Sequence, residues 1–223
     1  MGHVIDDALP PELVRRARRA IARLGDSGLR ASYFTTFWLP RGGVPAHPVE
    51  EAVLALWRLS GARCAGAEWW IGRSYTTDVP IEFHFDHDVK APGGLRHPRL
   101  SSVFFFNNVR GGQLAITDQV AGLRSAPVPA EPRRLQAVKP RRNRYALFSG
   151  RLLHGVLDAR GQTPRGRLPG PRGRLRVTLV INFWQRRPTG VPLWSESRAL
   201  RALGAKRRRG WSVSSPTFAS EAP

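Results

Sequence analysis

Residues 174–184 read RLRVTLVINFW, and this stretch predicts a long β-strand with two unlike faces. Side chains of a strand point alternately to its two sides, so every second residue shares a face. One face is wholly apolar and comprises Leu175, Val177, Leu179, Ile181 and Phe183. The other face is mixed and comprises Arg176, Thr178, Val180, Asn182 and Trp184. The apolar face is expected to be buried, and the arginine on the mixed face needs an explanation of its own.

The sequence around this strand indicates a mainly β fold with flanking helices. From residue 68 onward, short β-prone runs alternate with Gly- and Pro-rich breaks, as in a sandwich or barrel. The runs are Glu68–Tyr75, Pro80–Phe85, Leu100–Asn107, Gln113–Asp118, Arg144–Phe148, Leu152–Leu157 and Arg174–Trp184. Earlier, residues 11–25 and 47–60 have helical apolar spacing and residues 31–39 are β-prone. The simplest architecture is two leading helices packed on a jelly-roll-like core.

Three segments are predicted along the chain. Residues 1–67 form a helical and mixed segment that packs on the core, and residues 68–190 form the β core. Residues 191–223 form a basic tail, which contains the run Lys206-Arg207-Arg208-Arg209 and is expected to be flexible. Within the core, residues 161–173 (GQTPRGRLPGPRG) are expected to form an exposed, mobile loop.

Composition narrows the class of protein and the compartment. The single cysteine excludes an internal disulfide and a Cys-based zinc or iron–sulfur site, and it favours a cytoplasmic location. No apolar run is long enough to suggest a membrane span. The formal net charge of +20 is compatible with a nucleic-acid partner. The arginines are scattered along the chain, however, so a solvated basic surface is the simpler interpretation.

The stretch Glu82–Asp88 (EFHFDHD) contains the first candidate metal ligands. His84 and Asp86 are two residues apart, so an extended chain presents both to the same side. Two histidines and one carboxylate on one face of the metal are typical of non-haem Fe(II) oxygenases, in which three coordination positions stay open. His84 and Asp86 supply two of these three ligands, and the third must come from another part of the chain.

His154 is the candidate for the third ligand. It is one of only six histidines and lies in the apolar, strand-like run Leu152-Leu153-His154-Gly155-Val156. A buried histidine needs polar partners, and taken alone it is more simply a core residue bonded to backbone. The mixed face of residues 174–184 adds a second clue, because a buried arginine costs several kcal/mol unless it meets an anion. A dicarboxylate held by Arg176 and the Thr178 hydroxyl would supply that anion.

These residues, in this order, resemble a known signature. His84-Phe85-Asp86, then His154-Gly155, then Arg176-Val177-Thr178 look like the HxD…H…RxS/T pattern of the 2-oxoglutarate/Fe(II) dioxygenase superfamily, in its prolyl-hydroxylase-like branch. The resemblance covers roughly residues 68–186 and includes Val103–Asn108 with Gly111-Gly112-Gln113-Leu114, and Asn143–Phe148. It implies a double-stranded β-helix of the jelly-roll or cupin-like type.

The resemblance also implies the chemistry. His84, Asp86 and His154 would bind Fe(II), and Arg176 and Thr178 would hold the far carboxylate of 2-oxoglutarate. With O2 as the other co-substrate, a hydroxylase of this kind releases succinate and CO2. Arg176 follows His154 by 22 residues, more than is usual in the family, which leaves Arg174, and more weakly Arg172, as alternatives.

Further side chains are candidates for the surroundings of the metal. Tyr75, Asn182 and Trp184 are expected to line the pocket, with Trp69 and Trp70 as further candidates, although each aromatic could equally belong to the core. His87 faces away from His84 on an extended chain. Asp88 shares the face of His84 and Asp86 and could line the entrance of the site or bind a cationic substrate group, or lie in a solvated loop.

Other functions stay open on the sequence alone. A basic nucleic-acid-binding protein would explain the charge, and AlkB-type demethylases share the ligand pattern but carry a second arginine where this chain has Asn182. A cupin-like metal protein would not need the arginine. The expected substrate is an amino acid, a peptide or a small metabolite, with hydroxylation, desaturation and cyclisation all compatible, and the sequence specifies no oligomeric state.

Overall fold

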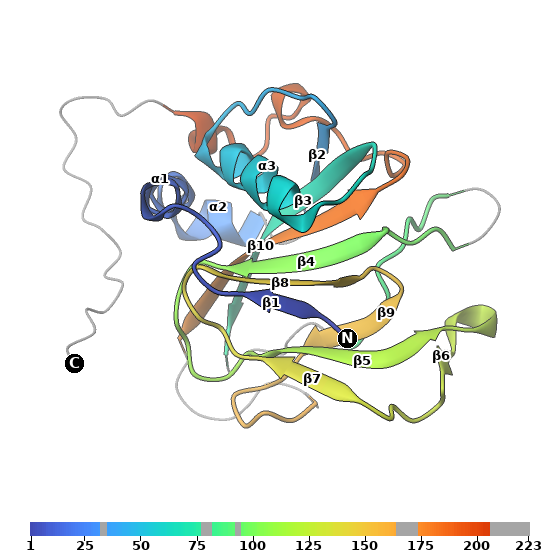
Figure 1. The fold of residues 1–223 in the computed structure, drawn as a ribbon. Coiled ribbons are helices and arrows are strands. Elements are labelled where there is room, and N and C mark those ends of the chain that lie inside the picture. Colours follow the sequence, from blue (N-terminus) through green and yellow to red (C-terminus); the bar gives the residue numbers. More distant parts are fainter. Residues whose placement is uncertain (32–34, 77–81, 92–94, 164–173, 206–223) are drawn as a thin grey trace.

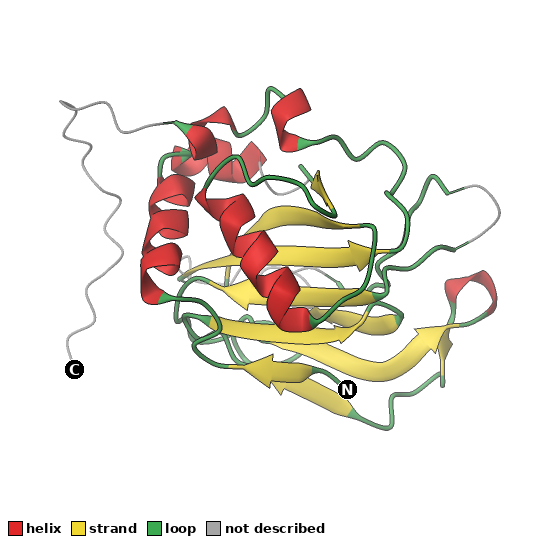
Figure 2. Cartoon of the chain, turned by 45° about the horizontal axis from the view of Figure 1, so that its top comes forward, coloured by secondary structure: helices red, strands yellow, loops and turns green. Residues whose placement is uncertain are grey.

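Two antiparallel β-sheets lie face to face, and helices cover the outer side of the larger one (Figures 1 and 2). This arrangement is taken from a computed structural model, which describes residues 1–31, 35–76, 82–91, 95–163 and 174–205. Every strand pair in both sheets is antiparallel. The mainly β, jelly-roll fold expected from the sequence is confirmed.

The larger sheet has six strands in the order β1-β8-β4-β10-β3-β2. Their bounds are β1 His3–Ile5, β8 Arg144–Ser149, β4 Leu100–Phe105, β10 Leu175–Trp184, β3 Gly66–Tyr75 and β2 Phe37–Pro40. The strand quoted first from the sequence, β10, lies between β3 and β4 in this sheet. Because it has neighbours on both edges, its alternation fixes which face of the sheet is apolar.

The smaller sheet is built around β5 Leu114–Ala121. β5 pairs with β6 Pro127–Val128, β7 Leu135–Val138 and β9 Leu152–Val156. Figure 1 shows this sheet below the larger one, with the helices above. A small apolar cluster joins the two sheets and includes Val103, Phe105, Leu114, Ile116, Val138, Ala146 and Phe148.

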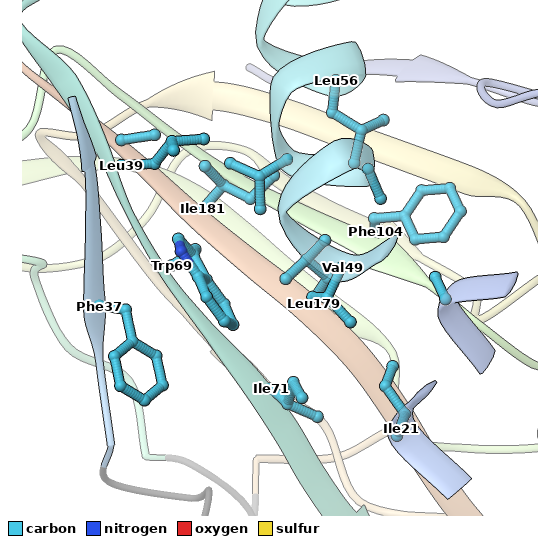
Figure 3. Packing of buried hydrophobic residues seen from close by; sticks show 14 of the residues in the cluster. Ile21, Phe37, Leu39, Val49, Leu56, Trp69, Ile71, Phe104, Leu179 and Ile181 are labelled. Atoms are coloured by element: carbon cyan, nitrogen blue, oxygen red, sulfur yellow. The ribbon is translucent and has the colours of Figure 1, made fainter. Parts of the chain in front are cut away.

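The outer, apolar face of the larger sheet packs under two helices. These are α1 Pro11–Ala22 and α3 Pro48–Ser60, and a short helix, α2 Gly25–Ala31, follows α1. The main core lies between these helices and the larger sheet. Its fully buried side chains include Trp69, Ile71, Leu179 and Ile181 (Figure 3). Truncating one of these side chains to alanine is expected to cost about 2–5 kcal/mol, because the sheet and α3 prevent the cavity from closing.

Most predicted elements are found, with shifted ends. The predicted helices correspond to α1 and α3, and six of the strand predictions to β3, β4, β5, β8, β9 and β10. The predicted strand at residues 80–85 is not confirmed within its described part, where only His84 makes an isolated bridge, and residues 80 and 81 lie outside the described residues. The strands β1, β6 and β7 and the helix α2 were not predicted, because each is short and carries little periodic signal.

The segment after residue 190 is partly packed, in contrast to the flexible tail expected from its composition. It forms two 3-10 turns, Trp194–Glu196 and Arg201–Gly204. Trp194, Leu200 and Leu203 are buried in the main core, so packing continues well beyond the predicted boundary at residue 191. The basic run 206–209 lies outside the described residues. Among the described residues, no helix is both long enough and apolar enough to cross a membrane.

The start of α3 depends on a buried histidine. His47 precedes Pro48, and its Nδ1 atom accepts a hydrogen bond from the backbone N–H of Glu50 at 3.3 Å. The ring packs edge-on against Trp194, with centroids 4.4 Å apart. Burial lowers the pKa of His47 to about 4. The neutral ring is the form that can accept this bond, so protonation both charges a buried group and removes the cap.

We expect His47 to make folding sensitive to mild acid. His47 is protonated near pH 6.5 in the unfolded chain but only near pH 4 in the folded chain. The free energy of unfolding therefore falls as the pH is lowered through this window. The contribution of His47 is expected to drop by about 2 kcal/mol between pH 7 and pH 5. The measurement is urea unfolding at both values for the wild type and His47→Asn, which keeps a capping acceptor. An equal fall in both proteins would contradict this role of His47.

Candidate metal centre

Two chain segments far apart in the sequence carry the predicted ligands, and a backbone bridge holds them together. The N–H of His84 donates to the carbonyl of His154 at 2.9 Å, and the N–H of His154 donates back to the carbonyl of His84 at 3.1 Å. His154 lies in the middle of β9, which is anchored to β5. The bridge therefore fixes the isolated ligand segment against a strand of the smaller sheet.

The ligand atoms of His84, Asp86 and His154 converge. All lie within 4.8 Å of one another. The Asp86 carboxylate is in the centre, with Oδ1 3.6 Å from Nε2 of His84 and Oδ2 3.4 Å from Nε2 of His154. The His154 and Asp86 side chains are only 8% and 10% exposed, whereas His84 is 40% exposed. The group is thus closed on the side of His154 and open on the side of His84.

Backbone carbonyls fix the orientation of both imidazoles. Nδ1 of His84 lies 2.8 Å from the carbonyl of Glu82, and Nδ1 of His154 lies 3.0 Å from that of Leu152. A carbonyl oxygen only accepts, so each Nδ1 must carry a proton and donate. In a neutral ring this leaves the lone pair on Nε2, the atom that faces Asp86. Such a hydrogen bond behind a histidine is the usual support of a metal ligand.

The ionisation states of Asp86 and His154 favour a bound cation between their side chains. Burial lowers the pKa of His154, which is therefore neutral and points a lone pair at the Asp86 carboxylate. Burial would raise the pKa of Asp86, but the neighbouring His84, whose own pKa is raised by Asp86, and the Ser101 hydroxyl hold it well below its usual range. An ionised carboxylate beside the lone pair of a neutral imidazole is unfavourable unless a positive charge lies between them. The donor set therefore fits a bound divalent metal, with imidazole and carboxylate ligands suited to iron.

Ser101 supports the central carboxylate, a role that no local pattern in the sequence predicts. Its hydroxyl donates to Oδ2 of Asp86 at 2.6 Å. Nδ1 of His97 donates to the backbone carbonyl of Asp86 at 2.6 Å. Ser101 lies on the inner face of β4, where alternation from Val103 and Phe105 would have placed it once the sheet partners were known.

Asp88 is not at the entrance of the site, contrary to one expectation from the sequence. Its side chain is 2% exposed and pairs with Arg96. It also accepts from the backbone N–H and the hydroxyl of Thr189, at 3.0 and 3.2 Å, and from the N–H of Lys90 at 3.2 Å. A carboxylate saturated in this way cannot receive a substrate cation. Asp88 instead fastens the loop after Asp86 to the chain that follows β10.

The inner face of β10 carries the other predicted residues. Arg176, Thr178 and Asn182 are 3%, 0% and 2% exposed, so three polar side chains are buried on the same face of this strand. The guanidinium of Arg176 lies over the ring of Phe105, 5.1 Å from its centre. Arg174 is exposed, which favours Arg176 between the two alternatives, whereas Arg172 lies outside the described residues. The Thr178 hydroxyl has no hydrogen-bond partner among the described residues.

Two other predicted pocket residues, Tyr75 and Trp184, differ in position. Tyr75 pairs with Leu175, and the alternation of β3 and β10 places it on the face opposite to Arg176. This register argues against a place for Tyr75 beside the metal ligands. Trp184 is on the inner face, but it packs with Trp38 and Val191. Its indole N–H donates to Oε2 of Glu68 at 3.0 Å.

One cross-strand row connects these observations. The registers align Trp38 of β2, Glu68 of β3, Asn182 of β10, Ser101 of β4 and Phe148 of β8. All five share the inner face, because residues paired directly across strands point to the same side. At one end the row reaches the metal ligands: Ser101 holds Asp86, and the ring of Phe148 contacts that of His154 with centroids 4.8 Å apart. We call this line of five residues the acceptor row.

Comparisons with known proteins agree with this fold. No protein-family model matches the sequence, and no curated protein matches it either. Among solved structures, HygX from Streptomyces hygroscopicus with nickel and 2-oxoglutarate bound is 15% identical, with a TM-score of 0.51 over 92% of this chain and 90% of HygX. At this identity the likeness concerns the fold.

Two further solved structures are similar in fold at comparably low sequence identity. A prolyl hydroxylase from Trichoplax adhaerens, solved with a hypoxia inducible factor peptide fragment, is 12% identical with a TM-score of 0.50, over 82% of this chain and 83% of that one. A prolyl 4-hydroxylase from Phytophthora capsici is 16% identical with a TM-score of 0.50, over 87% of this chain and 61% of the other. The fold implied by the resemblance to the prolyl-hydroxylase-like branch is therefore confirmed.

We expect Ser101→Ala to weaken metal binding about tenfold to a hundredfold, because loss of its hydrogen bond frees the Asp86 carboxylate to rotate. The measurement is anaerobic calorimetric titration with Fe(II). Ser102→Ala is the matched control, since its hydroxyl is also buried but donates to the carbonyl of Ile181 at 2.8 Å. Equal loss of affinity in both variants would mean that Ser101 acts through general stability and not through Asp86.

Proposed function

We propose that this chain is a non-haem Fe(II)- and 2-oxoglutarate-dependent dioxygenase. Its reaction would be hydroxylation of an unactivated C–H bond in an amino acid, a peptide or a small metabolite, with release of succinate and CO2. The single observation that carries the proposal is the convergence of His84, Asp86 and His154, whose ligand atoms lie within 4.8 Å of one another. Two imidazoles and one carboxylate leave three positions of an octahedral metal for co-substrate and oxygen.

The inner face of β10 supports 2-oxoglutarate as the co-substrate. Arg176 is buried there, and an arginine fork binds a carboxylate through two parallel hydrogen bonds. Thr178 is two residues further along the same face, with a buried hydroxyl that lacks a partner among the described residues. A carboxylate at this position would satisfy that hydroxyl. Gly72, the residue paired with Thr178, leaves the necessary room, since a Cβ there would collide with the hydroxyl.

The side chains of this site have separate tasks in the proposed reaction. Bound iron and 2-oxoglutarate would supply the activation of O2 and the removal of hydrogen from the substrate. Asp86 and the two histidines would hold the metal and leave coordination positions for the co-substrate and oxygen. Arg176 and Thr178 would hold the far carboxylate of the co-substrate and so fix its orientation. The apolar cluster between the sheets, which includes Phe105 and Phe148, keeps water from that side of the site.

The fold neighbours support this choice of ligands and substrates. HygX was solved with nickel and 2-oxoglutarate bound, and the Trichoplax enzyme with a peptide fragment. A metal and 2-oxoglutarate are therefore natural first ligands to test on this chain, and both a peptide and a small molecule are reasonable substrates. Asn182, at the position of the second arginine of AlkB-type demethylases, makes a nucleic-acid substrate the weaker choice.

The test is the visible charge-transfer band of an iron complex chelated by 2-oxoglutarate. Fe(II) and then 2-oxoglutarate are added to the purified protein without oxygen. We expect the band in the wild type and no band in His84→Ala, which loses a ligand. In Arg176→Ala the dissociation constant for 2-oxoglutarate should rise about thirtyfold or more, since one partner of a buried charge pair is removed. Arg174→Ala, an exposed arginine two residues away, should behave as wild type.

Each failure has a distinct meaning. Bound iron without the band would overturn the use of 2-oxoglutarate and favour a cupin-like metal protein. Absence of iron binding would overturn the metal site itself and return attention to the +20 charge and a nucleic-acid partner. An equal loss in Arg174→Ala and Arg176→Ala would mean that the assignment of the co-substrate arginine is wrong.

A further inference from the structure

The inner face of β3 and β10 is incompletely covered around Glu68. Glu68 and Trp70 of β3 and Val180 of β10 are half-buried, although their neighbours Trp69 and Ile181 on the outer face are fully buried. The smaller sheet pairs its strands around β5 and covers the side of β4 and β8. Glu68 and Trp70 therefore keep part of their surface exposed on the same face that carries Ser101.

Glu68 has an unusual position in so basic a chain. In a protein with a net charge of +20, it forms no ion pair with any lysine or arginine that the structure describes. Its Oε2 atom accepts from the indole of Trp184 at 3.0 Å. Burial raises the pKa of its carboxyl to about 7, and the charges of Asp86 and Asp88 add to the rise. A glutamine would serve the indole equally well, so a structural role alone does not explain an acid here.

Asn182 provides a second, independent observation. It is directly paired with Glu68 in the acceptor row and is 2% exposed. Its side-chain oxygen Oδ1 is buried and has no hydrogen-bond partner among the described residues. A buried carbonyl oxygen without a donor costs about 1–3 kcal/mol unless something else supplies the donor. The row thus presents two acceptors side by side, each with capacity for an incoming N–H group.

Trp70 completes the chemical character of this surface. It follows Glu68 by two residues on the same face of β3 and is only half-buried. The face of an indole attracts ammonium and guanidinium groups more strongly than any other side-chain ring. A carboxylate, an amide oxygen and an aromatic face together select a cation that carries N–H donors, and they repel an anion.

From this arrangement we propose that Glu68, Asn182 and Trp70 bind a cationic amine or guanidinium group of the substrate. The proposal rests on the proposed function, because it names the substrate class of that same metal site. β3 and β4 are separated by one strand, so the backbones of Glu68 and Ser101 are about 10 Å apart. A substrate held at Glu68 therefore reaches the metal with a carbon several bonds away from its charged group.

The experiment compares small probes of equal chain length and different charge. The probes are n-butylguanidinium, n-butylammonium, 1-butanol and butyrate, each titrated into protein loaded with Zn(II) and saturating 2-oxoglutarate. Saturation-transfer NMR gives the dissociation constants without any turnover. We expect both cations to bind at least about tenfold more tightly than 1-butanol, as hydrogen bonds to a charged group predict, and butyrate to bind no better than 1-butanol.

Glu68→Gln keeps an acceptor for Trp184 and removes the charge. We expect this variant to bind the two cations about tenfold more weakly while its affinities for Zn(II) and 2-oxoglutarate stay within about twofold of wild type. Glu131→Gln, an exposed glutamate on the loop after β6, is the matched control and should bind every probe as wild type does. Trp70→Leu should weaken guanidinium binding and leave 1-butanol unchanged.

The outcomes separate this inference from the proposed function. Cations that bind no better than 1-butanol, or that bind Glu68→Gln as tightly as wild type, overturn the inference. If the wild-type protein does not bind 2-oxoglutarate, the proposed function is overturned instead. The cation titration is then read with Zn(II) alone, where a preference that depends on Glu68 still supports the cation site and its absence still rejects it.

Discussion

A single strand has to satisfy two environments at once, and the rest of the structure follows from this constraint. β10 lies between β3 and β4, so each of its faces continues into the corresponding face of both neighbouring strands. Its apolar face, with Leu179 and Ile181, anchors the main core under α3. Its other face carries Arg176, Thr178 and Asn182 into the space between the sheets. A slip of one residue would put the polar set into the core, so the hydrophobic core and the site fix each other's register.

The same coupling extends to the three candidate metal ligands. His84 is not part of a regular strand, yet its backbone is bonded to that of His154 in both directions. Asp86 is held from the opposite sheet by Ser101. The three ligands therefore depend on the distance between the sheets as much as on local sequence. A substitution that alters the packing of Phe105 or Phe148 between the sheets would therefore shift the candidate ligands relative to one another.

Much of this could be predicted from the sequence because alternation and spacing are local signals. The two faces of β10 and the shared side of His84 and Asp86 follow from a period of two residues, and the family resemblance added His154. Residues that act through long-range partners could not be found in this way. Ser101, Glu68 and the burial of Asp88 depend on registers and contacts between distant segments, and Tyr75 faces away from Arg176 because of its pairing with Leu175. Short strands such as β1 and β7 exist only because a neighbouring strand offers an edge.

The hydrogen bonds between Asp88 and Thr189 mean that the fold needs more of the chain than the proposed signature, which ends at Thr178. A fragment that ended after Trp184 would retain every residue proposed to touch the metal or 2-oxoglutarate. It would nevertheless lose the backbone N–H and the hydroxyl of Thr189, which satisfy the buried Asp88 carboxylate two residues beyond Asp86. The loop that carries the candidate ligand Asp86 is therefore held in place by a part of the chain that no ligand motif includes. A chain cut between Trp184 and Thr189 would therefore keep the whole signature and still leave the buried Asp88 carboxylate short of two hydrogen bonds.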